Sequence, residues 1–156
     1  MLDMSVKHRI DVINGPNLNF LKDRNPMFYG FLSLKDIERS CKSLCLTHGI
    51  EVVFKQSSYE GQLIDWVHEA RMEADGLIIN PGGYAHTSIA LMDAVELADI
   101  PVVEVHLSNI MAREYFRQES YISKVVDGVI SGFQGRGYLL GLQFIIDKLH
   151  NHKTIN

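Results

Sequence analysis

The sequence predicts an α/β fold in which helices cover both faces of a parallel sheet. Apolar runs with strand periodicity alternate with segments of helical periodicity along the chain. One of these runs, Gly76–Asn80, is almost wholly apolar, which is typical of a parallel strand buried on both faces. No repeat, low-complexity stretch or interdomain linker interrupts the alternation, so residues 1–156 are expected to form a single domain.

Five strands are expected. The first, His8–Asn14, alternates in polarity and ends before a Gly-Pro turn. The others are Ile50–Lys55, Gly76–Asn80, Pro101–His106 and Gly128–Ser131, the last starting as early as Val125. Right-handed crossovers and five strands favour a flavodoxin-like three-layer sandwich with strand order 2-1-3-4-5. In such a sheet, ligands bind at the carboxyl ends of the strands.

Helices are expected between these strands. Ser33 and Asp36 match a capping box at the start of Ser33–His48, and Gly49 provides a stop. The remaining helical segments are Gly61–Glu73, Ser88–Ala98, a short turn at Ala112–Arg117, and Gly137–His150. The ends of the chain, residues 1–7 and 151–156, are expected to be flexible tails.

Composition narrows the function classes. The net charge of −4 and the pI near 5.9 argue against a general nucleic-acid or anionic-membrane surface. No apolar run reaches the roughly 20 residues that span a bilayer, and Met1–Lys7 lacks the apolar core of a signal peptide. Cys41 and Cys45 are one helical turn apart, unlike a CxxC redox or zinc motif, so reduced thiols and a cytoplasmic protein are expected.

Polar side chains gather after the first, third and fourth predicted strands. The first connection is about 16 residues long, against a usual two to six, which favours a lid or binding loop. The three segments contain Asn17, Arg24 and Tyr29, then Asn80 and His86, then Glu104, His106, Arg113 and Arg117. Asn and Gly are good turn formers, which explains any one loop. That explanation accounts less well for Arg, His and Tyr together at one edge of the sheet.

Two pairs within these segments suggest acid–base chemistry. A guanidinium beside a phenol stabilises the phenolate, so Arg24 and Tyr29 together could form a general base. Glu104 and His106 alternate along a strand and share a face, where the carboxylate would fix the imidazole tautomer and keep the ring protonated.

Each residue also has a purely structural interpretation. Tyr29 could be a packing residue and the Glu104–His106 pair a satisfied core pair. His86 could belong to a helix cap, and Asp93 to a solvated helix face.

Several common sites are missing from the sequence. There is no GxGxxG after the first strand, no P-loop and no GxSxG nucleophile elbow. His86, Glu104 and His106 do not have a metal-ligand spacing, so no metal and no cofactor are expected. The segment from Gly132 to Gly137 is interpreted as a tight strand-to-helix connection because its glycine spacing is wrong for a dinucleotide fingerprint.

The polar segments also occur as an ordered series of sequence blocks. They are Asn14–Asn19, Arg24–Pro26 through Tyr29–Gly30, Glu60–Asp65, Ile79–Tyr84, His86–Ser88, Asp93–Ala94, Glu104–Asn109, Arg113–Glu114, Phe116–Arg117 and Ser120–Tyr121. With these blocks, the chain resembles the type II 3-dehydroquinase (3-dehydroquinate dehydratase) family from about residue 8 to about residue 148. It departs from the family pattern at Lys22, Asn25, Ser58 and Met92, of which Lys22 and Asn25 bear on how the lid closes.

The resemblance implies a hydro-lyase that converts 3-dehydroquinate to 3-dehydroshikimate and water through an enolate, without metal or cofactor. Tyr29 would remove the proton next to the ketone with the help of Arg24, and Asn17 would hold a water that stabilises the enolate oxygen. His106, positioned by Glu104, would protonate the departing hydroxyl.

The resemblance also implies how the substrate is held and how the subunits assemble. The substrate contacts would come from Asn80, His86, Arg117, the backbone amides of Leu107 and Ser108, and Asp93 of a neighbouring subunit. The family assembles as a homododecamer of trimers. The resemblance leaves two physiological roles open, one in the shikimate pathway of aromatic amino acid biosynthesis and one in quinate catabolism.

Other functions remain as alternatives. A flavodoxin-like module could bind a small ligand without catalysis, although the loop after the first strand lacks the hydroxyls that an FMN phosphate needs and the strand ends lack the acidic cluster of a receiver domain. A serine hydrolase could use Ser88, His86 and Asp93, and a non-catalytic homologue could retain the fold alone.

Overall fold

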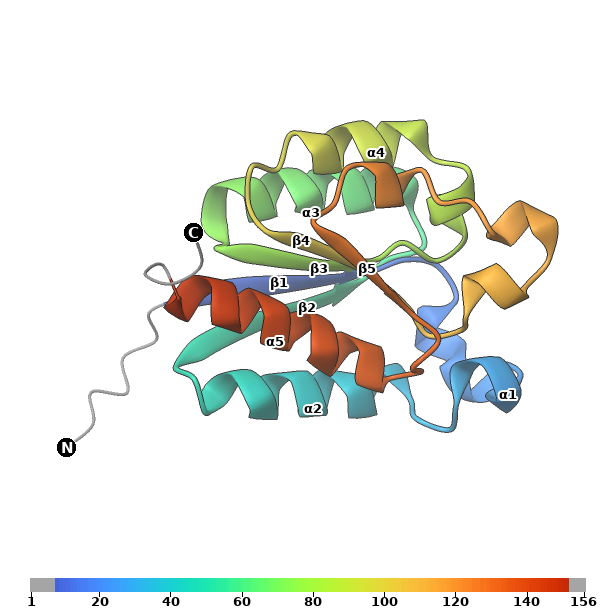
Figure 1. The fold of residues 1–156 in the computed structure, drawn as a ribbon, viewed down its shortest axis with the longest axis horizontal. Coiled ribbons are helices and arrows are strands. Elements are labelled where there is room, and N and C mark those ends of the chain that lie inside the picture. Colours follow the sequence, from blue (N-terminus) through green and yellow to red (C-terminus); the bar gives the residue numbers. More distant parts are fainter. Residues whose placement is uncertain (1–7, 152–156) are drawn as a thin grey trace.

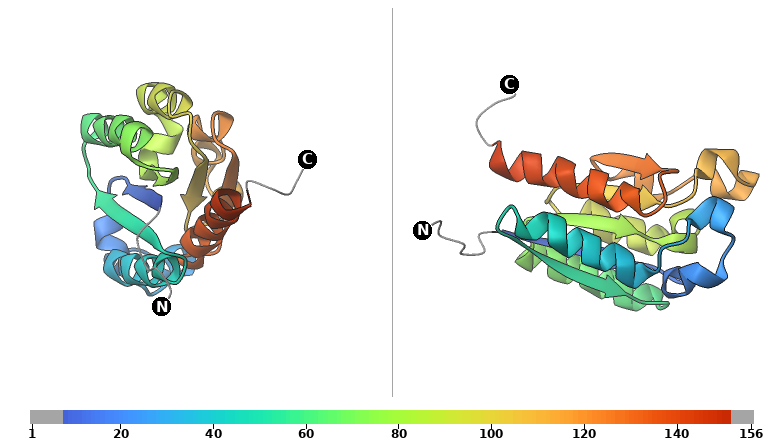
Figure 2. Two further views of the ribbon diagram at one scale, coloured as in Figure 1. Left: turned by 90° about the vertical axis from the view of Figure 1, so that its left-hand side faces the viewer. Right: turned by 90° about the horizontal axis from the view of Figure 1, so that it is seen from below.

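The computed structural model describes residues 8–151, so the predicted tail 1–7 and all but the first residue of the predicted tail 151–156 lie outside the described residues. These residues form a three-layer sandwich around a five-stranded parallel sheet of order β2-β1-β3-β4-β5, which confirms the predicted fold and strand order. Helices α2 and α5 cover one face of the sheet, and α3 and α4 cover the other (Figure 1). Views from the end and from below show the same two helix layers on either side of the twisted sheet (Figure 2).

The five strands agree closely with the sequence prediction. They are β1 (His8–Asn14), β2 (Ile50–Gln56), β3 (Gly76–Asn80), β4 (Val102–His106) and β5 (Gly128–Ser131). The prediction that the last strand starts as early as Val125 was wrong. The backbone N–H of Val125 instead bonds the carbonyl of Ile122 and closes a 3₁₀ turn over Ile122–Lys124.

The helices are α1 (Pro26–Tyr29), α2 (Leu34–Leu46), α3 (Glu60–Glu73), α4 (Ile89–Glu96) and α5 (Arg136–His150). The predicted capping box is present, with reciprocal bonds between Ser33 and Asp36. The single turn predicted at Ala112–Arg117 was wrong, because two 3₁₀ turns, Ile110–Ala112 and Tyr115–Arg117, flank an extended Arg113. The short helix α1 within the first connection was not predicted.

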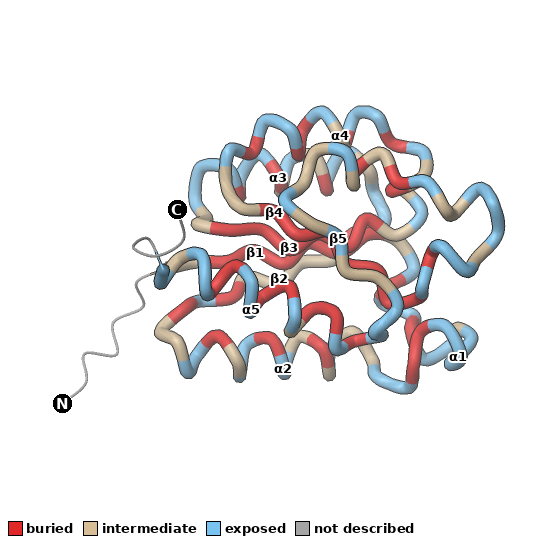
Figure 3. Tube along the Cα trace, viewed as in Figure 1, coloured by how far each residue is buried: buried red, intermediate tan, exposed pale blue. Residues whose placement is uncertain are grey.

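The core consists of two apolar clusters, one on each face of the sheet. Buried residues run along the central strands and the inward sides of the helices (Figure 3). Cys41 and Cys45 are free and belong to the cluster under α2 and α5. Burial raises the pKa of the Cys41 thiol to about 12 and that of Cys45 to about 11, so both remain protonated at neutral pH. Among the described residues, no helix combines the length and apolarity that crossing a bilayer requires.

The parallel arrangement brings the ends of β1, β3 and β4 to one edge of the sheet. Asn14 of β1 aligns with Asn80 of β3, and the loops that follow them touch. The backbone N–H of Gly15 donates to the carbonyl of Asn80 at 2.8 Å. A Cβ at Gly15 would lie 2.3 Å from the carbonyl oxygen of Pro81, so only glycine permits this approach. Helix α1 and the turns after β4 extend beyond the same edge (Figure 1).

Candidate active site

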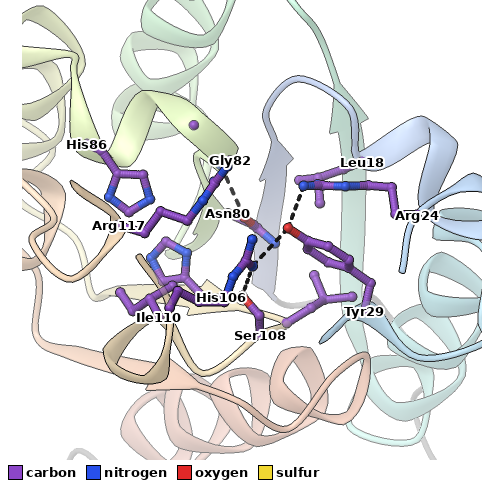
Figure 4. Close-up of a pocket in the computed structure, with 13 residues that line it drawn as sticks. Leu18, Arg24, Tyr29, Asn80, Gly82, His86, His106, Ser108, Ile110 and Arg117 are labelled. Carbon is purple, nitrogen blue, oxygen red and sulfur yellow. Dashed lines mark hydrogen bonds between the residues drawn. The ribbon is translucent and has the colours of Figure 1, made fainter. Parts of the chain in front are cut away.

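A pocket opens at this edge of the sheet. Tyr29 and Arg24 lie on one side, His86, His106 and Arg117 on the other, and Asn80 between them (Figure 4). The full lining is Leu18, Arg24, Tyr29, Asn80, Gly82, Gly83, His86, His106, Leu107, Ser108, Ile110, Arg113 and Arg117. Eight of the eleven site residues expected from the sequence therefore line one pocket, and a ninth, Glu104, supports it from behind.

Tyr29 is the last residue of α1 and is 8% exposed. Asn25 caps this helix through the N–H of Met27 at 3.0 Å, and Pro26 occupies its first position, which explains why so short a segment turns helical. Arg24 donates to the Tyr29 hydroxyl, and its guanidinium carbon lies 3.7 Å from the centre of the phenol ring. The predicted Arg–Tyr pair is therefore present.

Arg113 is a second cation that bonds the same phenol, a role that was not predicted from the sequence. Its Nη1 donates to the Tyr29 hydroxyl at 3.1 Å and to Ser108 Oγ at 3.0 Å. Its guanidinium also stacks over the ring of Phe28, 4.2 Å from the centroid. The sequence did contain a signal for Arg113, since Arg113–Glu114 is one of the blocks that carry the family resemblance. Spacing in the sequence does not, however, show which partner the guanidinium of so long a side chain reaches.

The arginines of the pocket affect one another. Burial is the main cause of a lowered pKa for Arg24; the charge of Tyr29 opposes it, while the charges of Arg117 and Arg113 reinforce it. For Arg113, burial works against the charged form, but the hydrogen bonds and charges of Tyr29 and Glu114 together outweigh it and raise the pKa. Three guanidiniums thus line one pocket of an acidic protein, which suits a small anionic ligand.

His106 and Glu104 form the predicted pair at the end of β4, with both side chains buried. Nε2 of His106 lies 2.6 Å from Oε1 of Glu104. Ser120 and Ser123 also donate to the Glu104 carboxylate, and neither contact was predicted from the sequence. Burial raises the pKa of Glu104, but the hydrogen bond and charge of His106 and the two serine hydroxyls outweigh it, so the pKa falls below its ordinary value.

His86 lies beside His106, with ring centroids 6.3 Å apart and planes 22° from parallel. Its Nδ1 is 2.7 Å from the carbonyl oxygen of Glu119. A carbonyl can only accept, so Nδ1 carries a proton and Nε2 is free to act as an acceptor. Arg117 completes this side of the pocket and pairs with Glu114 at 3.2 Å.

Asn80 is the last residue of β3 and is 2% exposed. Its Oδ1 accepts from the backbone N–H of Gly82 at 3.2 Å, and its Nδ2 donates to the hydroxyl of Tyr138 at 2.9 Å. Leu107 and Ser108 follow β4 and form the adjoining wall. The structure therefore brings these three predicted contacts together with Tyr29 and His106.

Two predicted site residues do not line the pocket of the single chain. Asn17 is exposed and left-handed, with φ 68°, although the next residue, Leu18, forms part of the wall. Asp93 is exposed on α4. Their roles remain predictions. Within residues 8–151, no three His, Cys, Asp or Glu side chains are grouped to hold a metal ion.

Comparisons with known proteins agree on one family. The family model described as dehydroquinase class II matches residues 8–146. The chain is 49% identical to the 3-dehydroquinate dehydratase of Bartonella henselae over 144 residues, which is 92% of this chain and 97% of that protein. It is 53% identical to the 3-dehydroquinate dehydratase of Dinoroseobacter shibae over 136 residues, 87% of this chain and 91% of that one. The crystal structure of type II dehydroquinase from Propionibacterium acnes superposes with a TM-score of 0.87 at 35% identity, covering 91% and 98% of the two chains.

Proposed function

The chain belongs to the dehydroquinase class II family, and from that premise we propose that Tyr29 and His106 carry out the two proton transfers of the family's reaction. The protein is a hydro-lyase that dehydrates 3-dehydroquinate, giving 3-dehydroshikimate and water. One observation carries the assignment of roles. A single pocket holds a phenol bonded by two guanidiniums and an imidazole bonded by a buried carboxylate.

Tyr29 is the base. Arg24 and Arg113 both donate to its oxygen, so two positive charges lie where a phenolate would carry its negative charge during the reaction. The phenolate removes the proton from the carbon next to the ketone, and the electron pair moves onto the carbonyl oxygen to form an enolate. A water held by Asn17 stabilises that oxygen in the manner of an oxyanion hole.

His106 is the acid. Its Nε2 hydrogen is donated to Glu104, so Nδ1 is the ring nitrogen left to give a proton to the departing hydroxyl. The ionised Glu104 stabilises the imidazolium until that proton leaves. The enolate electrons then re-form the ketone and a carbon–carbon double bond forms as water departs, so the product is a conjugated enone.

The remaining pocket residues hold the substrate. Arg117, His86 and Asn80, with the backbone amides of Leu107 and Ser108, offer donors and an acceptor to one carboxylate and several hydroxyls. A binding module without catalysis is not favoured, since simple binding gives no reason to place two arginines on one buried phenol.

We also propose a homo-oligomer of trimers assembled into a dodecamer, in which Asp93 completes the pocket of a neighbouring subunit. Support comes from Asp93 itself, which is exposed on α4 and outside the pocket of its own chain. Ile89 and Leu97, at the two ends of this helix, are 56% and 55% exposed and would be buried by such an interface. The two free, buried thiols support a cytoplasmic location.

The test follows the enone absorbance after 3-dehydroquinate is added to protein treated with a chelator. Tyr29→Phe should abolish turnover while calorimetry still detects substrate binding, because only the proton acceptor is lost. Tyr59→Phe is the matched control, since Tyr59 is 78% exposed. Circular dichroism must show both variants folded. Near-normal turnover by Tyr29→Phe would remove Tyr29 from its role as the base.

A further inference from the structure

Four consecutive hydrogen bonds link buried groups of the protein to Asn80, which lines the pocket. Asn14 Nδ2 donates to the backbone carbonyl of Lys55 at 3.0 Å. The Tyr138 hydroxyl donates to Asn14 Oδ1 at 2.6 Å and accepts from Asn80 Nδ2 at 2.9 Å. Asn80 Oδ1 accepts from the N–H of Gly82 at 3.2 Å. Tyr138, on α5, joins the ends of two neighbouring strands, β1 and β3.

The donor-to-acceptor direction of these hydrogen bonds is fixed at both ends by a backbone group. The carbonyl of Lys55 can only accept, so the nitrogen end of the Asn14 amide must face it and the oxygen end must face Tyr138. The N–H of Gly82 can only donate, so the oxygen end of the Asn80 amide must face that group. Reversing either amide would set two donors or two acceptors against each other inside the protein.

Tyr138 is the link that transmits this direction. Its side chain is fully buried, and burial raises the pKa of Tyr138 above its ordinary value, so the hydroxyl keeps the proton that it donates to Asn14. Its oxygen then serves as the acceptor for Asn80. The Asn80 amide nitrogen has two hydrogens, of which Tyr138 takes one, and Asn80 lines the pocket.

From this arrangement we propose that Tyr138 is a positioning residue for substrate recognition. Its hydroxyl holds the Asn80 amide so that the second N–H donates to an anionic or hydroxyl oxygen of the bound substrate. The inference rests on the proposed role of Asn80 in binding 3-dehydroquinate. Tyr138 itself does not line the pocket, so it acts only through Asn80.

Tyr138→Phe tests the inference, since it keeps the ring and removes the one oxygen that orders the chain. The KM for 3-dehydroquinate should rise about tenfold, because the substrate would lose about one hydrogen bond between Asn80 and a charged group. The change in kcat should be much smaller. Ile146→Val is the matched control, because it trims another buried side chain of α5 without touching the chain of hydrogen bonds. Thermal melting of both variants separates loss of stability from loss of recognition.

Two double variants make the outcome decisive. If Tyr138 acts through Asn80, then Tyr138→Phe should not raise KM further in an Asn80→Ala background. A calorimetric titration of 3-dehydroquinate into Tyr29→Phe and into Tyr29→Phe/Tyr138→Phe should show the same loss of affinity without turnover. An unchanged KM in Tyr138→Phe, or an equal rise with and without Asn80, would overturn the inference. An unchanged KM in Asn80→Ala would instead contradict the proposed role of Asn80.

Discussion

The Nη1 atom of Arg113 lies 3.1 Å from the phenol oxygen of Tyr29, although 84 residues separate the two in the sequence. Arg24, on the same loop as Tyr29, donates to the same oxygen. Arg113 follows β4, so the phenol oxygen accepts from one cation of its own loop and from one cation of the segment after β4. When the loop carrying α1 is in this position, the proposed base carries two countercharges instead of the one that the sequence suggested.

Replacing Arg113 should therefore impair proton abstraction. Arg113→Ala is expected to lower kcat/KM about 100-fold, since a hydrogen bond to a charged group contributes about 1.5–3 kcal/mol and each 1.4 kcal/mol is tenfold. Arg113→Lys should have an activity between those of the wild type and Arg113→Ala, because a lysine keeps the charge but lacks the planar guanidinium that stacks over Phe28. The enone assay measures both, with Arg39→Ala on the exposed side of α2 as control. Full activity in Arg113→Ala would show that Arg24 alone is enough.

Local patterns predicted the fold because the fold depends on local rules. The alternating residues of His8–Asn14 and the Ser33–Asp36 capping box each specify their own element, and the structure has both. The family resemblance identified the pocket residues that adjoin strand ends. Ser120, Ser123 and Tyr138 were missed because their roles depend on partners 16, 19 and 58 residues away, which no periodicity reveals.

The acid stability of the protein should depend on Glu104. Its pKa in the folded protein is below the ordinary value of 4.5, so as the pH falls the unfolded chain takes up the proton first. The stability that the ionised carboxylate contributes is thus complete above its unfolded pKa and is lost as the pH drops through the lower folded-state pKa. Glu104→Gln should consequently show a shallower fall in unfolding free energy than the wild type between about pH 5 and pH 3.

Urea unfolding at several pH values measures this difference. Glu119→Gln is the control, because Glu119 also has a lowered pKa but is exposed and pairs only with Lys124 at the surface. Its curve should follow the wild type closely. If Glu104→Gln and the wild type lose stability in parallel, Glu104 is not ionised in the way that its three hydrogen bonds indicate.

The serines behind Glu104 should matter for catalysis although neither lines the pocket. Ser120→Ala with Ser123→Ala removes two hydrogen bonds from the carboxylate that holds His106. Each such bond contributes about 1 kcal/mol, about 2 kcal/mol for the two, so kcat should fall roughly 30-fold in the double variant while KM changes little. Ser43→Ala, on the exposed side of α2, is the control. A rise in KM with unchanged kcat would instead indicate that the serines shape the substrate site.

Gly15 should be intolerant of any side chain. In Gly15→Ala the new Cβ would lie 2.3 Å from the carbonyl oxygen of Pro81, so the loops after β1 and β3 must separate. We expect a loss of about 1–3 kcal/mol in unfolding free energy, together with reduced activity because Asn80 precedes Pro81. Gly61→Ala is the matched control: no atom lies within 4 Å of its Cβ position in α3, and alanine favours a helix. Equal stability of the two variants would contradict the close approach of the loops.

A subunit-mixing experiment tests whether Asp93 completes a neighbouring pocket. Tyr29→Phe lacks the base in its own pocket, and Asp93→Asn lacks the carboxylate that it would supply to another. Each variant alone should be nearly inactive, since every site of either assembly has one defect. In mixed assemblies, a pocket of an Asp93→Asn chain that receives Asp93 from a Tyr29→Phe chain is intact. Random pairing of equal amounts would make about a quarter of the sites complete.

Co-expression of the two variants with different tags, followed by isolation of doubly tagged protein, provides the material. Activity well above that of either parent would show that Asp93, exposed on α4 of its own chain, acts across a subunit boundary. Tyr29→Phe mixed with Arg24→Ala is the control, because Arg24 and Tyr29 bond within one chain and mixing cannot repair either defect. Recovery in both mixtures would point to exchange of the whole lid segment, whereas recovery in neither would leave Asp93 as a residue of the solvated helix face.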